Sequence, residues 1–71
     1  METSIRLKIG KNIRKFRKKC RLTQEKLAEL AGIDYKYLQR LEGKTPPNIK
    51  VDTIAKIAKP LKIDSSKLLA S

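Results

Sequence analysis

The segment from Leu22 to Lys44 constrains the fold more than any other part of the chain. Its sequence, LTQEKLAELAGIDYKYLQRLEGK, predicts two short helices joined by a tight turn at Gly32. Thr23 and Asp34 stand where the first amides of each helix need a capping oxygen. Glycine most readily adopts the left-handed conformation that ends a helix. The segment therefore predicts two consecutive helices and no strand.

The second of these helices, from Tyr35 to Leu41 or Glu42, carries more polar residues than its own packing requires. Leu38 and Leu41 form its inner edge, and one apolar stripe is enough to hold a helix in its domain. The polar and basic side chains on its remaining surface are Tyr35, Lys36, Gln39 and Arg40. This second face predicts contact with a molecule outside the domain.

The charge of the chain indicates what kind of molecule that is. Its 71 residues include 18 lysines and arginines against 7 acids, which gives a formal net charge of +11. Residues 1–21 hold nine of the basic residues and only one acid. Any single lysine is best interpreted as part of a solvated helix face, but the total favours an anionic partner such as nucleic acid.

The composition excludes several other classes of protein. The chain has no histidine, which is the commonest general base and metal ligand, and its acids do not cluster. Cys20 has no second cysteine to pair with, so a reducing, cytoplasmic location fits best. No apolar run approaches the roughly 20 residues of a membrane span. We expect no enzyme activity, metal, cofactor, small-molecule ligand or membrane insertion.

Apolar spacing predicts three further helices, and hence one all-α domain of five helices over residues 1–71. The first helix runs from about Ser4, its expected N-cap, to Lys19. Its apolar stripe is Ile5, Ile9, Ile13, Phe16 and Cys20, and we interpret the cysteine as a small buried apolar residue. The fourth helix runs from about Val51 to Lys59 and ends before Pro60. Asp64 or Ser65 caps a short fifth helix that ends at Leu68 and Leu69.

The second and fourth helices each have a predicted buried stripe. The residues expected to be buried in the second helix are Leu27, Leu30 and Ala31, with Ala28 small enough for another helix to cross closely. Those expected in the fourth helix are Val51, Ile54, Ala55 and either Ala58 or Ile57. Leu61 and Ile63 are expected to extend the core.

The motif between residues 23 and 42 resembles that of a known family. The matching residues are Thr23-Gln24, Leu27-Ala28, Gly32-Ile33, Leu38 and Leu41-Glu42-x-Gly. Together at these spacings they resemble the helix-turn-helix domain of phage-repressor and Cro-like regulators, the xenobiotic-response-element family. The resemblance covers roughly residues 9–69. It implies a compact, lambda-repressor-like domain whose recognition helix, residues 35–42, enters the DNA major groove.

The resemblance also implies a role for individual residues. The implied DNA contacts are Thr23, Gln24, Tyr35, Lys36, Tyr37, Gln39, Arg40, Lys44 and Thr45. Thr23 and Gln24 would meet a phosphate at the positive end of the second helix, and the loop after the third helix would grip the other strand. Tyr37 is equally well interpreted as partly buried. Arg17 and Glu42 are expected to form a structural ion pair.

The leading hypothesis is a sequence-specific double-stranded DNA-binding transcriptional regulator. It would act as a repressor, as a homodimer on a near-palindromic operator, in a bacterial nucleoid or from a phage. A second hypothesis is an antitoxin or adaptor that keeps this fold, binds a partner protein through its last two helices and binds DNA weakly. A third is a basic first helix that binds anionic membrane.

Overall fold

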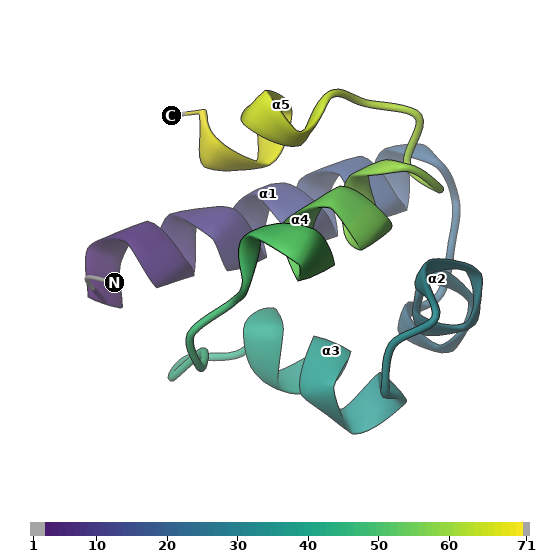
Figure 1. The fold of residues 1–71 in the computed structure, drawn as a ribbon. Helices are drawn as coiled ribbons and strands as arrows, with labels where there is room; N and C mark the ends of the chain where they lie inside the picture. Colours follow the sequence, from purple (N-terminus) through teal and green to yellow (C-terminus); the bar gives the residue numbers. More distant parts are fainter. Residues whose placement is uncertain (1–2, 71) are drawn as a thin grey trace.

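Residues 3–70, which the computed structural model describes, form five α-helices joined by short connections (Figure 1). The helices are α1 (Thr3–Lys19), α2 (Gln24–Ala31), α3 (Tyr35–Leu41), α4 (Val51–Ala58) and α5 (Ser65–Leu69). No strand occurs in this range. The predicted all-α architecture is confirmed, and the predicted helix ends are correct to within about one residue.

Side-chain oxygens cap the first turns of α2 and α3, as the sequence predicts. Thr23 Oγ1 accepts a hydrogen bond from the amide of Lys26 at 3.0 Å, and Asp34 Oδ2 accepts one from the amide of Tyr37 at 3.1 Å. Between the helices Gly32 has a φ of 70°, in the left-handed region, where a side chain would be strained. These local contacts fix the turn and so set where α3 starts relative to α2.

The last two helices also begin and end on recognisable residues. Asp64, rather than Ser65, caps α5, because its Oδ1 accepts a hydrogen bond from the amide of Ser66 at 2.9 Å. Helix α4 ends at Ala58, two residues before Pro60, which has no amide to continue the helix.

Three expectations for α1 were wrong. Ser4 lies inside the helix, which already includes Thr3, because the apolar stripe does not mark where the backbone becomes helical. Ile5 remains 40% exposed because it lies in the first turn of α1, near the end of the helix. Cys20 is exposed because it follows the last residue of α1, where helical spacing no longer applies; its Sγ lies 3.7 Å from the carbonyl oxygen of Leu61.

One apolar core lies between the helices. Its buried residues are Ile9, Ile13, Leu27, Ala28, Ala31, Leu38, Leu41, Ile49, Ile54, Ile57, Ala58, Leu61 and Leu68. The sequence left open whether Ala58 or Ile57 is buried in α4, and the structure buries both residues. Ile63 packs against this core while remaining partly exposed.

Three further residues predicted to be buried, in α2 and α4, are exposed instead. Leu30 is 50% exposed because Ala28 takes its place in the buried arc of α2, and Leu30 lies about 60° outside that arc. In α4 the buried arc is centred on Ile54. Ala55 falls outside this arc and is exposed. Val51, at the first residue of the helix, is 81% exposed.

Gly10 and Asn12 provide two of the contacts that hold α1 against its neighbours. Gly10 allows α1 to cross the end of α3 closely, since a Cβ at this position would overlap the carbonyl oxygen of Leu41. On another side of α1, Asn12 Nδ2 donates to the carbonyl oxygens of Leu68 and Ala70, at 2.9 and 2.7 Å. These contacts make α1 the support on which both α3 and α5 rest.

Candidate nucleic-acid interface

The two faces of α3 have opposite character. Leu38 and Leu41 are buried in the core, and the side chains on the outer face are exposed, namely Tyr35, Lys36, Gln39 and Arg40. Gln39 Nε2 donates to the hydroxyl of Tyr35 at 3.1 Å. Within residues 3–70 neither Lys36 nor Arg40 is paired with a carboxylate. The outer face therefore presents two unpaired cations and a preoriented amide.

A network around Glu42 holds the end of α3 to the rest of the domain. Arg17 Nε and Nη2 each donate to a different carboxylate oxygen of Glu42 at 2.9 Å, and Arg17 Nη1 donates to the carbonyl oxygen of Leu22 at 2.8 Å. The Arg17 and Glu42 side chains are only 12% and 3% exposed. A two-point arginine–carboxylate contact fixes orientation as well as distance. We call these contacts, with that of Gln24 described below, the Glu42 network.

The start of α2 lies beside the end of α3. Gln24 is half-buried, and its Nε2 donates to Glu42 Oε1 at 3.1 Å. An amide nitrogen has two hydrogens, so one remains available for a further acceptor. Thr23 is exposed next to it, with its hydroxyl already used to cap α2. The positive end of the α2 dipole is thereby placed close to α3.

The loop between α3 and α4 is held at two points. The hydroxyl of Tyr37 donates to the carbonyl oxygen of Asn48 at 3.1 Å, and Arg6 Nη1 donates to that of Pro46 at 3.3 Å. Lys44 and Thr45 are exposed on this loop. Tyr37 is half-buried and packs against the core. Of its two interpretations, the structure therefore supports the partly buried one.

The residues nominated from sequence therefore lie on three connected segments: the start of α2, the outer face of α3 and the loop that follows it (Figure 1). Sequence reasoning missed Arg6, which ties this loop to α1. Nothing in the sequence around Arg6 indicates this role, because its partner lies 40 positions away.

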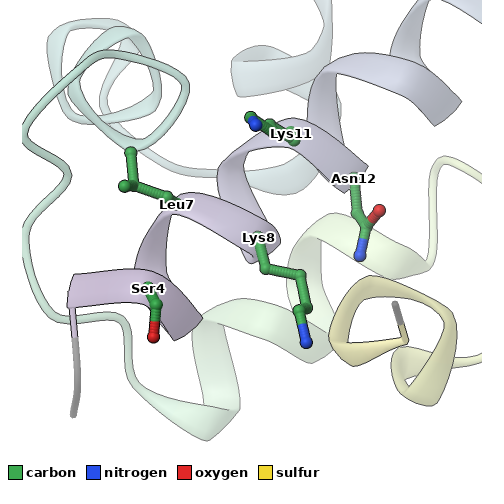
Figure 2. A pocket seen from close by; sticks show the side chains of 5 residues that line it. All are labelled: Ser4, Leu7, Lys8, Lys11 and Asn12. Atoms are coloured by element: carbon green, nitrogen blue, oxygen red, sulfur yellow. The ribbon is translucent and has the colours of Figure 1, made fainter.

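The structure also has hollows away from these three segments. A hollow along α1, lined by Ser4, Leu7, Lys8, Lys11 and Asn12, includes none of the interface residues (Figure 2). The side-chain amide of Asn12 already donates hydrogen bonds to backbone carbonyl oxygens at the end of α5. No group of three histidine, cysteine or acidic side chains in residues 3–70 is arranged to hold a metal ion. None of the helices in that range combines the length and apolarity needed to cross a membrane.

Comparisons with known proteins agree with this geometry. The sequence model of a helix-turn-helix domain family matches residues 10–71. The restriction-modification controller protein C.AhdI from Aeromonas hydrophila has a similar structure, with a TM-score of 0.83 and 33% identity over 89% of this chain and 94% of that one. A hypothetical transcription factor, NHTF, from Neisseria has a TM-score of 0.86 and 32% identity over 92% of this chain and 72% of that one. The comparison with curated proteins gave no match.

The family match covers most of the chain, and both similar structures share its arrangement of helices. The chain belongs to the helix-turn-helix DNA-binding regulators of the Cro/C1, xenobiotic-response-element type.

Proposed function

We propose that this regulator binds specific double-stranded DNA sequences by inserting the recognition helix, residues 35–42, into the major groove. The observation that carries the proposal is the outer face of α3. Its polar side chains are exposed, and its cations have no carboxylate partner in residues 3–70. The Glu42 network meanwhile holds the end of α3 against α1. A rigid helix with unsatisfied donors on one face is suited to base edges.

The side chains on this face match the hydrogen-bonding groups of bases. Lys36 and Arg40 can donate to O6 and N7 of guanine, and Gln39 can pair with N6 and N7 of adenine. The Gln39 amide already lies 3.1 Å from the hydroxyl of Tyr35. That contact reduces the side-chain entropy that Gln39 would lose on binding. Tyr35 itself can contact a thymine methyl group or a phosphate.

The neighbouring segments would position the protein on the phosphate backbone. Thr23 and Gln24 combine backbone amides, a spare amide hydrogen and a helix N-terminus, all of which favour a phosphate. Lys44 and Thr45 would contact phosphates of the other strand from the loop after α3. Tyr37 would act mainly by holding that loop, through its bond to Asn48.

We propose further that residues 1–71 act as one domain, and that the protein functions in the cytoplasm as a homodimeric repressor on a near-palindromic operator. The similar structure from Aeromonas hydrophila is named as a restriction-modification controller, which supports a regulatory role. A dimer places two recognition helices on one face of the duplex. A dimer bound across a promoter would block it by occupying the DNA, and repression would need no other activity. No cofactor enters this proposal.

Selection of bound duplexes from a random library at physiological salt tests the proposed function. We expect an enriched near-palindrome with half-sites about one helical turn apart. Affinity for the selected site should fall with salt, with a slope of about −0.9 in log K against log salt for each phosphate contacted. A folded protein that enriches no sequence would contradict sequence-specific binding and favour the adaptor hypothesis.

A further inference from the structure

Leu30 is the starting point for a second binding surface. It is 50% exposed, whereas the other apolar residues of α2, Leu27, Ala28 and Ala31, are buried. It lines a hollow together with Ala31, Lys56, Lys59, Pro60 and Lys62. A second hollow shares Leu30, Pro60 and Lys62 and adds Cys20 and Leu22. We call the two together the α2–α4 hollow.

The floor and rim of this hollow have different chemistry. Leu30 and Pro60 lie in both parts, with Leu22 and Ala31 beside them, so its centre is apolar. The three charged residues of the lining are all lysines, and no carboxylate belongs to it. Glu29, the acid next to Leu30 in the chain, is paired with Lys26 at 2.9 Å.

Lys62 occupies a position that usually takes glycine. Its φ is 58°, in the left-handed region. The bonds from Lys62 N to Lys59 O and from Ile63 N to Ala58 O are those of a helix-ending turn. A side chain in this conformation is uncommon because it is sterically strained. The chain thus has a lysine on the rim where glycine would be easier to accommodate.

We propose that the α2–α4 hollow binds an amphipathic helical segment of another polypeptide, with apolar side chains on one face and acidic residues along its flanks. The apolar side chains would cover Leu30 and Pro60, and the acids would pair with Lys56, Lys59 and Lys62. An apolar centre within a polar rim is the usual arrangement of a protein-binding hot spot. Complementary charge selects the partner and speeds association.

Charge also argues against a second copy of this chain as the occupant. Two copies that met through this surface would bring the same three lysines together, and each carries a net charge of +11. Like charges placed against each other disfavour association. Nucleic acid could pair with the lysines but would leave the apolar floor uncovered.

The hollow does not overlap the proposed DNA interface. Its lining includes no residue of α3, of the loop of residues 42–50 or of the Thr23–Gln24 pair, although Leu22 directly precedes Thr23. In Figure 1 α3 lies at the bottom, whereas the connection between α4 and α5 lies at the upper right. An acidic segment could therefore bind a regulator that is already on DNA. This inference does not depend on which sequence the protein recognises.

Cys20 provides a direct measurement at the site, because it is the only cysteine of the chain, is exposed, and lines the hollow. The probe is a synthetic helical peptide of leucine, glutamate and alanine with its leucines on one face. The control peptide has the same composition with its leucines spread around the helix. Peptide at about ten times its Kd should slow iodoacetamide alkylation of Cys20 by about tenfold, and the control peptide should not.

Two pairs of variants separate this site from general attraction to a basic protein. Leu30→Ser should abolish protection, and Leu69→Ser should keep it, because Leu69 is almost equally exposed, at 49%, but lies outside the hollow. Lys59→Glu should weaken protection more than Lys67→Glu. Helical circular dichroism would verify that each variant folds.

Four results would overturn the proposal. In the first, neither peptide protects Cys20. In the second, both peptides protect it equally, which would mean attraction by charge alone. In the third, protection survives Leu30→Ser, which would mean that the apolar centre is not used. In the fourth, a DNA duplex protects Cys20 as well as the peptide does, which would make the surface a polyanion site.

Discussion

Two arginines lie on opposite sides of α3 and show two different uses of the same side chain. Arg17 is almost buried, and its guanidinium makes three hydrogen bonds, two to Glu42 and one to Leu22. Arg40 is exposed and has no carboxylate partner in residues 3–70. Arg17 belongs to α1 and contacts Glu42 at the end of α3, whereas Arg40 belongs to α3 itself. Burial and hydrogen bonding, and not residue type, distinguish the structural arginine from the one available for binding.

This difference has a physical basis. A buried charge must be paired and hydrogen-bonded or it destabilises the fold, so the Glu42 network has to be complete. An exposed cation has water as its partner and adds little to stability. Four exposed polar residues on one face of α3 are therefore not explained by folding. The comparison predicts that changes to the Glu42 network alter stability and changes to the outer face alter binding.

The largest expected effect comes from breaking the Glu42 network. Glu42→Ala removes the partner of Arg17 and leaves an almost buried guanidinium without a carboxylate. Removing one member of a buried pair costs about 3 to 5 kcal/mol, a large part of the stability of a small domain. Urea unfolding followed by circular dichroism measures the loss.

A double variant is the matched control for this experiment. Arg17→Met with Glu42→Leu removes both charges and keeps apolar volume, so it should regain most of the lost stability. If Glu42→Ala unfolded at the same urea concentration as the parent protein, the network would not be structural.

The second prediction concerns the outer face of α3. Lys36→Ala and Arg40→Ala should each reduce discrimination between the selected site and random DNA by about 1 to 3 kcal/mol, the worth of a good contact to a base. Competition binding with the two kinds of duplex measures the difference, and urea unfolding should be almost unchanged. Equal losses on both duplexes would indicate phosphate contacts instead.

Tyr37→Phe should have a smaller effect, because it removes one hydroxyl and keeps the ring against the core. The lost bond to the carbonyl oxygen of Asn48 is expected to cost about 1 kcal/mol of stability. DNA affinity should fall only to the extent that losing this bond makes the loop that carries Lys44 less ordered. A loss of sequence discrimination as large as that of Arg40→Ala would place Tyr37 among the base-contacting residues.

The smallest expected effect is at Asp64, an exposed carboxylate that contrasts with the buried one of Glu42. Hydrogen bonds from the backbone and side chain of Ser66 lower the pKa of Asp64 in the folded protein. A carboxyl pKa that is lower in the folded state stabilises the fold above the unfolded pKa, about 4, and this contribution is lost as the pH falls through the folded pKa. Asp64→Asn keeps a capping residue.

Comparing the urea midpoints of Asp64→Asn and the parent protein at several pH values tests this prediction. The small deficit of the variant at neutral pH should disappear as the pH falls below about 4. A deficit that stays constant with pH would show that Asp64 acts only through cap geometry.

Contacts between residues close in the chain were the easiest to predict. Thr23, Gly32 and Asp34 form caps and a turn whose chemistry depends on only a few neighbouring residues. The five helices followed from apolar spacing. The division of α3 into an inner apolar edge and an outer polar face also followed from spacing, and this pointed to Tyr35, Lys36, Gln39 and Arg40 as candidate contact residues.

Features that depend on packing between helices were not predictable in the same way. Apolar spacing placed Leu30 and Val51 in the core, but which arc of a short helix is covered depends on its neighbours. The same holds for Arg6, whose bond to the carbonyl oxygen of Pro46 joins residues 40 positions apart. Gly10 is a further case, since only the approach of Leu41 explains why a side chain is excluded there.

Parallel selections from one random duplex library, with the parent protein and with Arg40→Ala, test the central claim most directly. If the outer face of α3 contacts base edges, both proteins should enrich related near-palindromes. The variant should lose preference at one symmetric position in each half-site and keep the others. The same consensus from both proteins, with only weaker binding by the variant, would contradict base recognition by Arg40 and reduce its role to phosphate contact.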